Sequence, residues 1–403
     1  MGLMFDEIFR EELEKESVFT DASKLLPDYL PEKLPCREEE YRQLVRFFKP
    51  LLETRCPQRV LITGKIGVGK TALARRFGQE IERVARKSGM NLDYIHINCR
   101  GKRTSYSLLL TIVHRYFPRW PSRGVGEGEL LSMLTSHLNN HDVFSIIALD
   151  EIDYFVQLSG SDVLYSLTRV SEESGTPGRI SLIAISRNRD FLKGLDAPTQ
   201  GTFLHNVLEL NPYTADQLEE ILKYRMKEAF KRGRVQEDVI PLIAEIASRS
   251  GDARFALELL FRAGMIADEE KSKVVLPEHV RAAKASVLPE LRKDAMGDLT
   301  LHELLVLLAL VRRLKTSNRA YVLTGELEKS YHLVCEELKE RPRQHSRMLS
   351  YLYRLRDLGF VEVQPTTIHP KGQTQKISLE EVPARELEKE VEKVLESLRK
   401  EET

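Results

Sequence analysis

The segment 64–71 constrains this chain more than any other: it reads Gly-Lys-Ile-Gly-Val-Gly-Lys-Thr, the full G-x-x-x-x-G-K-[ST] phosphate-binding pattern. A short β-rich stretch, Arg59–Thr63, precedes the segment, and a helical pattern begins at Thr71. This strand–loop–helix order is the context in which backbone N–H groups close around phosphate oxygens. The sequence therefore predicts nucleoside triphosphate binding; a purely structural glycine-rich turn is the alternative interpretation.

Individual residues of this loop have separate expected tasks. Lys70 would reach the β and γ oxygens of the nucleotide, and Thr71 would place its hydroxyl on Mg²⁺. The three glycines let the backbone approach the phosphates closely. The expected nucleotide contacts in the loop are Gly64, Lys65, Ile66, Gly67, Val68, Gly69, Lys70, Thr71 and Ala72.

A second signal lies further along the chain, where the apolar run Ile146–Leu149 ends in Asp150 and Glu151. Open α/β sheets bind ligands at the carboxyl ends of their strands, so a strand here would deliver both carboxylates to the nucleotide. We expect Asp150 to hold Mg²⁺ together with Thr71, and Glu151 to polarise the attacking water. An ordinary acidic strand end is the alternative.

Charge limits where a nucleic-acid surface could lie. The 403 residues carry 61 basic and 61 acidic side chains, which cancel to a formal net charge of zero. The net charge therefore gives no sign of nucleic-acid binding, and any surface that binds nucleic acid must be a local basic patch. The length suits two or three domains.

Compartment signals point to the cell interior. The four cysteines, at positions 36, 56, 99 and 335, are too scattered for a disulfide framework and suggest reduced thiols. The N-terminus lacks a signal-peptide profile, and the longest apolar run, Leu304–Val311, is too short to span a bilayer. We expect a cytoplasmic, nucleoid-associated protein with no membrane partner.

Three domains are expected from the changes in pattern. Strands at 59–63, 92–98, 144–149 and 180–186 alternate with helices and predict an α/β domain with a mostly parallel sheet. Helical patterns then follow the capping-box sequence at 214–217, and three helices with a β-hairpin (360–364 and 376–379) predict a winged helix-turn-helix. The expected boundaries are 1–212 for the N-terminal arm and ATP-binding domain, 213–294 for an all-helical lid, and 295–403 for the winged domain. A charged helix at 385–402 is either solvated or packed on the body.

Several motifs together resemble a known family. Leu34-Pro-Cys-Arg precedes the phosphate loop, Leu149-Asp-Glu-Ile-Asp-Tyr marks the metal site, Pro212-Tyr-Thr-Ala-Asp opens the lid, and Gly251-Asp-Ala-Arg lies inside it. With a winged helix at the end, the chain resembles the AAA+ superfamily and, within it, the archaeal origin-recognition and helicase-loading replication-initiator family. The resemblance implies ATP/ADP and Mg²⁺ as cofactors. It also implies double-stranded origin DNA, paralogous initiator subunits and the replicative helicase as partners.

The resemblance also implies further site residues. Arg254 of the lid would reach the phosphates, and Leu30, Pro31, Leu34 and Arg37 would line the adenine pocket. The other expected nucleotide-binding residues are Asn188, Tyr213 and Arg225.

Two departures from the family pattern bear on hydrolysis. Arg187 stands where a polar sensor Asn is usual, with Asn188 displaced by one, and no arginine occurs between Arg189 and Arg225 to serve as an arginine finger. Because a finger accelerates hydrolysis by orders of magnitude, we expect slow hydrolysis and a nucleotide that acts mainly as a conformational and assembly switch. An arginine finger displaced to Arg187 or Arg189 is the alternative. The two departures together indicate a divergent paralogue within the family.

The third helix of the winged domain is the expected DNA-reading element. At about 100° per residue, a basic and polar stripe that includes Arg347 and Ser350 separates from an apolar one, as in a helix that enters the major groove. A Pro/Gly-rich excursion after Phe117 corresponds to the family's second DNA contact; packing of its Trp120 on the core is the alternative. The DNA-binding candidates are Arg119, Trp120, Arg123, Arg343, Arg347, Tyr351, Arg354, His369 and Lys371.

Two other classes of function stay open at this point. A winged-helix regulatory ATPase that remodels or signals need not bind duplex DNA tightly without its partners. A clamp-loader-like assembly subunit would carry a collar domain in place of the winged helix.

Overall fold

The computed structural model describes residues 16–120, 124–174, 178–284, 296, 299–317, 321–368, 372–379 and 384–401. It divides into two compact units, 1–280 and 281–403, and each is treated by itself below.

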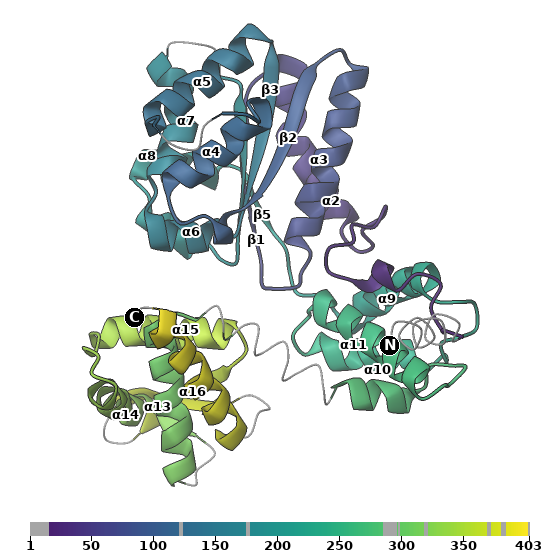
Figure 1. Ribbon diagram of the computed structural model, residues 1–403, viewed down its shortest axis with the longest axis vertical. Coiled ribbons are helices and arrows are strands. Elements are labelled where there is room, and N and C mark those ends of the chain that lie inside the picture. Colours follow the sequence, from purple (N-terminus) through teal and green to yellow (C-terminus); the bar gives the residue numbers. More distant parts are fainter. Residues whose placement is uncertain are drawn as a thin grey trace, which may run out of the picture. The chain divides into compact units, whose positions relative to one another are not determined.

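A five-stranded parallel sheet forms the centre of the first unit, in the order β2-β3-β4-β1-β5 (Figure 1). The strands are β1 (Arg59–Thr63), β2 (Asn91–Asn98), β3 (Val143–Asp150), β4 (Ile180–Ser186) and β5 (Val207–Glu209). The four predicted strands are confirmed. The fifth strand was not predicted, because three residues are too few to show a pattern.

Helices cover both faces of this sheet, which is why its central strands are apolar throughout (Figure 1). Alternate residues of β3 enter two separate cores: Ile147 and Leu149 pack with one set of helices, Ile146 and Ala148 with the other. The second set is α2 (Glu38–Thr54) and α3 (Lys70–Lys87), and α3 directly follows the phosphate loop. The first set is α4 (Ser105–Tyr116), α5 (Glu127–Asn140), α6 (Ile152–Ser159), α7 (Asp162–Ser174) and α8 (Ala197–Leu204).

An all-helical segment follows the sheet in the same unit. Its helices are α9 (Ala215–Ala229), α10 (Val239–Ser248) and α11 (Ala253–Glu269), and residues 277–284 are also helical. The predicted capping box starts α9: Thr214 N–H donates to Gln217 Oε1 (3.0 Å), and Gln217 N–H donates to Thr214 Oγ1 (3.4 Å). We call this segment the lid.

The described part of the N-terminal arm packs on the lid rather than on the sheet. Ser17 Oγ and Val18 N–H both donate to Asp268 of α11, at 2.6 and 2.7 Å. The Phe19 ring fills the space that a side chain at Gly264 would need. A 3₁₀ turn, η1 (Ala22–Leu25), continues the arm along α9. The arm therefore adds to the lid core before the chain reaches the α/β domain.

The second unit is a winged helix-turn-helix, as predicted. Its helices are α13 (Leu301–Ser317), α14 (Thr324–Glu337) and α15 (His345–Asp357), and its three-stranded antiparallel sheet contains β6 (Val322–Leu323), β7 (Val361–Ile368) and β8 (Gly372–Leu379). The hairpin is longer than the sequence suggested. Its extra residues are mostly Thr and Gln, which favour or tolerate strands but do not show an apolar alternation.

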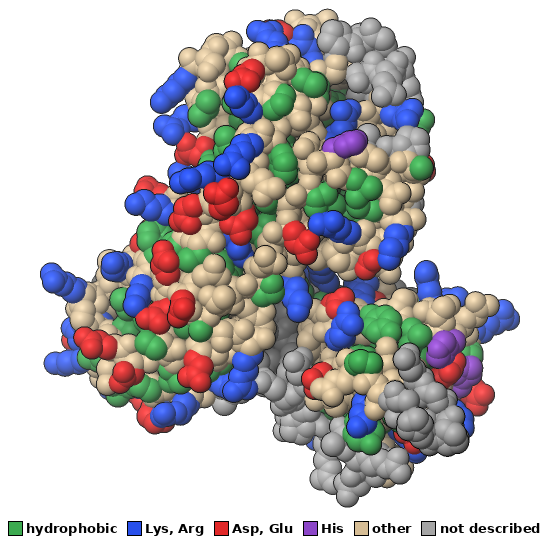
Figure 2. Space-filling model, turned by 180° about the vertical axis from the view of Figure 1, so that it is seen from behind, with side chains coloured by type: hydrophobic (Ala, Val, Ile, Leu, Met, Phe, Trp, Pro, Cys, Tyr) green, Lys and Arg blue, Asp and Glu red, His purple; other side chains and the backbone are tan. Residues whose placement is uncertain are grey.

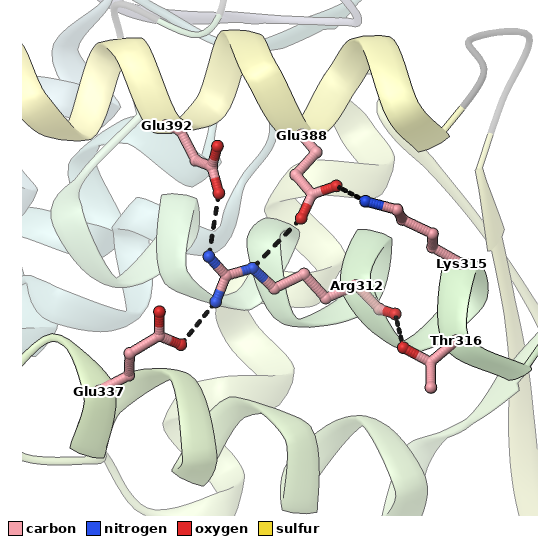
Figure 3. A network of polar contacts seen from close by, with 6 residues as sticks. All are labelled: Arg312, Lys315, Thr316, Glu337, Glu388 and Glu392. Carbon is pink, nitrogen blue, oxygen red and sulfur yellow. Dashed lines mark hydrogen bonds and ion pairs between the residues drawn. The ribbon is translucent and has the colours of Figure 1, made fainter.

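The C-terminal helix α16 (Ala384–Glu401) packs on α13 and is not a solvated tail. Leu387, Val391 and Leu395 are buried in the core of the second unit. Figure 3 shows the polar border of this contact: Arg312 of α13 forms ion pairs with Glu337 of α14 (2.6 Å) and with two carboxylates of α16. Those carboxylates are Glu388 (3.4 Å) and Glu392 (2.9 Å). One guanidinium thus joins three helices.

Other composition-based expectations can be compared directly. All four cysteines are free thiols. No helix among the described residues is long and apolar enough to cross a bilayer. On the face seen in Figure 2, basic and acidic side chains are interspersed, consistent with the zero net charge.

Candidate nucleotide site and nucleic-acid interface

The phosphate loop has the backbone that its glycines allow. Gly64, Gly67 and Gly69 have φ values of 151°, 74° and 91°, a region that L-residues rarely adopt. A Cβ on Gly64 would lie 2.5 Å from the carbonyl oxygen of Leu210, so the loop is closely packed as well as tightly turned. This tightly turned loop leads directly into the N-terminus of α3, where the helix dipole favours an anion.

Lys70, Thr71 and Asp150 meet beside this loop. Lys70 Nζ donates to the carbonyl oxygens of Gly64 (2.6 Å) and Lys65 (2.7 Å), and burial lowers the pKa of Lys70 to about 8. Thr71 Oγ1 donates to Asp150 Oδ2 at 2.7 Å. Burial opposes ionisation of Asp150, but hydrogen bonds from His96 and Thr71 outweigh it and hold the pKa of this carboxyl below its usual value.

These groups fit the cofactors that the sequence predicts. A threonine hydroxyl and a carboxylate in contact are hard oxygen donors, the type that Mg²⁺ prefers in nucleotide sites. The three loop glycines supply the positive φ angles that a backbone cradle for phosphates needs. Thr71 and Asp150 would hold the metal, and Lys70 with the loop backbone would hold the phosphates.

Glu151 lies at the end of β3 in a strained conformation. Its φ and ψ are 55° and 40°, a left-handed geometry that costs about 1–2 kcal/mol for a non-glycine residue. Among the described residues Glu151 Oε2 accepts no hydrogen bond, and its nearest cation is Arg100, 3.8 Å away at the end of β2. Strain of this type concentrates at functional positions. The sequence analysis missed Arg100 because a basic residue in a loop carries no signal of its own.

The lid touches the phosphate loop through the start of α11. Ala253 N–H donates to the carbonyl oxygen of Gly67 at 3.1 Å. The carboxylate of Asp252 caps α11 by accepting the N–H groups of Arg254 (2.7 Å) and Phe255 (3.0 Å), and a Cβ on Gly67 would overlap it at 1.7 Å. The helix that carries Arg254 therefore begins at the loop, with the Arg254 side chain exposed.

Arg37 has a structural task that the family resemblance did not indicate. Its buried guanidinium donates to the carbonyl oxygens of Val68 (3.1 Å) and Asn211 (2.7 Å) and to Glu40 (2.6 Å), and it lies over the Tyr213 ring at 3.9 Å. Its polar groups are thus committed to protein acceptors rather than directed to an adenine. Tyr213 itself lies next to the loop, because its hydroxyl is 3.0 Å from the position of a Cβ on Gly69. Pro31 is buried, and Leu30 and Leu34 are half-buried.

Two expected nucleotide contacts have other roles in the structure. Arg225 donates to the carbonyl oxygen of Lys24 and lies over the Tyr29 ring, so it fastens the N-terminal arm to the lid. Asn188 is exposed, and its side chain accepts the N–H of Asp190 at 2.9 Å to form a turn. The charge of the neighbouring Arg187 contributes to lowering the pKa of Lys70, after the larger effect of burial. The nucleotide contacts expected of Arg225 and Asn188 stay predictions.

The basic stripe of the winged domain is less available than the helical pattern suggested. Arg354 pairs with Glu303 of α13 at 3.2 Å, and the Glu303 side chain is only 1% exposed. Arg343 precedes α15 rather than lying on it, and its Nε donates to His302 Nε2 at 3.0 Å. Tyr351 is half-buried and stacks on His302. A helical wheel cannot foresee these partners, because they come from α13.

Arg347 is exposed on α15, and its guanidinium has no hydrogen-bond or ion-pair partner among the described residues. Arg341 is exposed nearby and was not among the predicted contacts. The predicted contacts His369, Lys371 and Arg123 lie outside the described residues.

Trp120 packs on the core of the α/β domain, the alternative that the sequence left open. Its ring meets Phe117 edge-on, and its buried indole N–H has no hydrogen-bond partner among the described residues. Its carbonyl oxygen contacts His114 at 3.0 Å. The Trp120 side chain is thus partly buried, whereas Arg119 is exposed; the DNA contact expected of each stays a prediction.

Comparison with known proteins agrees with this arrangement. The family described as "AAA domain" matches residues 57–192, "Cdc6 AAA+ ATPase-type lid domain" matches 219–285, and "CDC6, C terminal winged helix domain" matches 294–389. The ORC1-type DNA replication protein 2 of Sulfurisphaera tokodaii is 34% identical over 93% of this chain and 92% of its own length. Its counterpart in Saccharolobus solfataricus is 35% identical, with 88% and 89% covered. Among solved structures, the Aeropyrum pernix ORC1 protein in complex with DNA has a TM-score of 0.72 at 32% identity, with 95% of this chain and 98% of that chain covered.

The fold and site define an AAA+ ATPase with a Cdc6-type lid and a C-terminal winged helix. The extent of the similarity goes further. The chain belongs to the archaeal family of ORC1-type DNA replication proteins.

Replacing Gly67 by alanine tests the contact between loop and lid. The positive φ costs about 1–3 kcal/mol for a non-glycine residue, and the new Cβ would displace Asp252 from the start of α11. We expect lower stability and nucleotide affinity weaker by at least about tenfold, measured by urea unfolding and by titration with a fluorescent ADP. The matched control is Gly128→Ala, where a Cβ would meet nothing within 4 Å. Equal behaviour of the two variants would contradict the contact.

Substitutions at Arg354 and Arg347 should differ in their effect on stability, because Arg354 has a buried partner and Arg347 is exposed. Arg354→Met leaves the buried Glu303 carboxylate without its cation, and we expect a loss of about 2–3 kcal/mol in the free energy of unfolding. Adding Glu303→Gln, which keeps an acceptor for the Thr300 N–H, should recover most of this loss. Arg347→Met should change stability by less than about 0.5 kcal/mol. Urea unfolding followed by circular dichroism distinguishes them; equal losses would refute the assignment.

Proposed function

We propose that this protein is a DNA replication initiator that binds duplex origin DNA through its winged helix, with ATP and ADP as the two states of an assembly switch. The single observation that carries the proposal is the contact of the lid with the phosphate loop, Ala253 to Gly67, in a chain that ends in a winged helix. The family membership supports the same conclusion.

The nucleotide end of the proposal rests on this chain's own side chains. Lys70 and the loop backbone bind the phosphates, Thr71 and Asp150 hold Mg²⁺, and Glu151 orients the water. Bound Mg²⁺–ATP supplies the reactive phosphoanhydride. Arg254 follows Ala253, which contacts Gly67, and we propose that its side chain binds the γ-phosphate and so links the lid to the nucleotide. The domain bounds 1–212, 213–294 and 295–403 belong to this proposal.

The DNA end of the proposal rests on fewer residues than the sequence suggested. Arg341 and Arg347 are exposed around the start of α15, the helix that enters the major groove in helix-turn-helix proteins. Arg119 of the α/β domain is exposed and is proposed as a separate DNA contact. The Aeropyrum pernix relative of the same fold is described in complex with DNA, which supports this assignment. Paralogous initiator subunits and the replicative helicase are the proposed protein partners.

Slow hydrolysis is part of the same proposal. With no arginine between Arg189 and Arg225, the chain offers no finger in the usual place, and Arg189 pairs with Glu209 at 2.9 Å. Nucleotide states would then be long-lived, as an assembly switch requires.

Salt-dependent DNA binding tests the function. We expect duplex affinity to fall steeply with salt, and the slope of log K against log salt to decrease by about 1–2 in the Arg341→Ala/Arg347→Ala variant, because each lost phosphate contact removes about 0.9. The control, Arg46→Ala/Lys49→Ala, removes two exposed cations of α2 and should keep the wild-type slope. Negligible or salt-independent binding by the wild type would sink the proposal.

Turnover tests the absence of a finger. We expect hydrolysis on the order of 10⁻³ s⁻¹, near that of nucleotide hydrolases without their finger, and independent of protein concentration. Turnover of the Glu151→Gln variant gives the background. A specific rate that rises steeply with protein concentration would reveal an arginine supplied by a neighbour and would contradict the prediction.

A further inference from the structure

A series of hydrogen bonds links two side chains of β2 to Asp150. Tyr94 and His96 stand two residues apart on β2 and therefore on the same face of the sheet. Tyr94 Oη lies 3.1 Å from His96 Nδ1, and His96 Nε2 lies 3.2 Å from Asp150 Oδ2. The same Oδ2 atom accepts the Thr71 hydroxyl, so His96 and Thr71 hold one carboxylate oxygen between them.

The direction of these hydrogen bonds follows from chemistry. An ionised carboxylate can only accept, so the hydrogen must lie on His96 Nε2. In a neutral imidazole Nδ1 then carries a lone pair and accepts the Tyr94 hydroxyl. The other oxygen of Asp150 accepts the backbone N–H of Glu151 at 3.0 Å. Each oxygen of Asp150 is thereby directed, which fixes the rotamer of the carboxylate.

The outer end of the chain is itself fixed. β2 is an edge strand, and the N–H of Tyr94 donates to Glu82 of α3 at 2.7 Å. The Tyr94 ring lies directly on Gly78 of α3, where a Cβ would come within 2.2 Å of it. Helix α3 starts at the phosphate loop, so the element that supplies Thr71 also positions Tyr94. Helix α3 therefore positions both the phosphate loop and the hydrogen-bonded residues Tyr94 and His96.

Other described histidines do not share this arrangement. His114 contacts the carbonyl oxygen of Trp120, and His279 pairs with Glu270 on the lid. The His96 side chain is 19% exposed and the Asp150 side chain 6%, so the contact is largely shielded from water. A histidine that serves only the core would not need a carboxylate from the metal site.

We propose that His96, oriented by Tyr94, is a positioning residue that holds Asp150 in the rotamer required to share Mg²⁺ with Thr71. The inference rests on the proposed nucleotide site and assigns a residue to it. Such outer partners typically change metal affinity by 10–100-fold when they are removed.

The test measures how much Mg²⁺ strengthens nucleotide binding. Fluorescent ADP is titrated into the full chain in EDTA and in Mg²⁺, and the ratio of the two Kd values is compared among variants. His96→Leu should leave the Kd in EDTA within about twofold and reduce the Mg²⁺-dependent gain by about tenfold or more. His96→Gln, whose amide nitrogen can take the place of Nε2, should recover most of the gain. Tyr94→Phe should lie between them.

Three results would overturn the inference. The first is a His96→Leu variant in which Mg²⁺ strengthens ADP binding as much as in the wild type. The second is an ADP affinity that falls equally in EDTA and in Mg²⁺ and that His96→Gln does not recover, because such a loss indicates a merely structural role. The third needs no variant: long-range proton–nitrogen NMR of the wild type would overturn the inference if it showed the His96 hydrogen on Nδ1. We expect it on Nε2. His114→Leu is the matched control and should keep the full gain. If the wild type itself bound no nucleotide in either condition, the proposed function would fail instead.

Discussion

The buried guanidinium of Arg37 is the interaction on which the arrangement of the nucleotide site depends. A charge that is 3% exposed is costly unless each donor finds an acceptor, and the acceptors of Arg37 come from separate segments. Val68 belongs to the phosphate loop, Asn211 to the connection toward the lid, and Glu40 to α2. Moving any of these segments would leave a buried donor of Arg37 without its acceptor. The loop, the connection and α2 therefore keep one geometry.

That geometry brings the lid onto the phosphate loop, where two effects on Asp252 oppose each other. Asp252 must lie over Gly67 to cap α11, yet loss of hydration there raises the pKa of its carboxyl above the usual value. Phosphates bound to the same loop would face this carboxylate, and like charges repel. Lys70 opposes the repulsion with its own charge. The lid contact thus places a carboxylate and the Lys70 ammonium group beside the same loop.

The sequence predicted the parts of this protein that depend on local pattern. The phosphate loop, the buried strand that ends in Asp150, the capping box at Thr214 and the winged domain follow from short-range periodicity and turn chemistry. What it missed depends on contacts between distant segments. His96 meets Asp150 only because β2 pairs with β3 in one particular register. The short helices α6 and α8 escaped notice because eight residues show too little periodicity.

The winged domain shows why a charge pattern alone does not define an interface. His302 accepts Arg343 at Nε2, so its hydrogen lies on Nδ1 and is donated to the Tyr331 hydroxyl, 2.8 Å away. That hydroxyl also accepts the Arg343 N–H at 3.2 Å. Two groups of one arginine are thus used to fix the entry to α15, and Glu303 fixes Arg354 near its end. Arg343 and Arg354 thus hold α15 within the winged domain, whereas Arg347 is exposed on its surface.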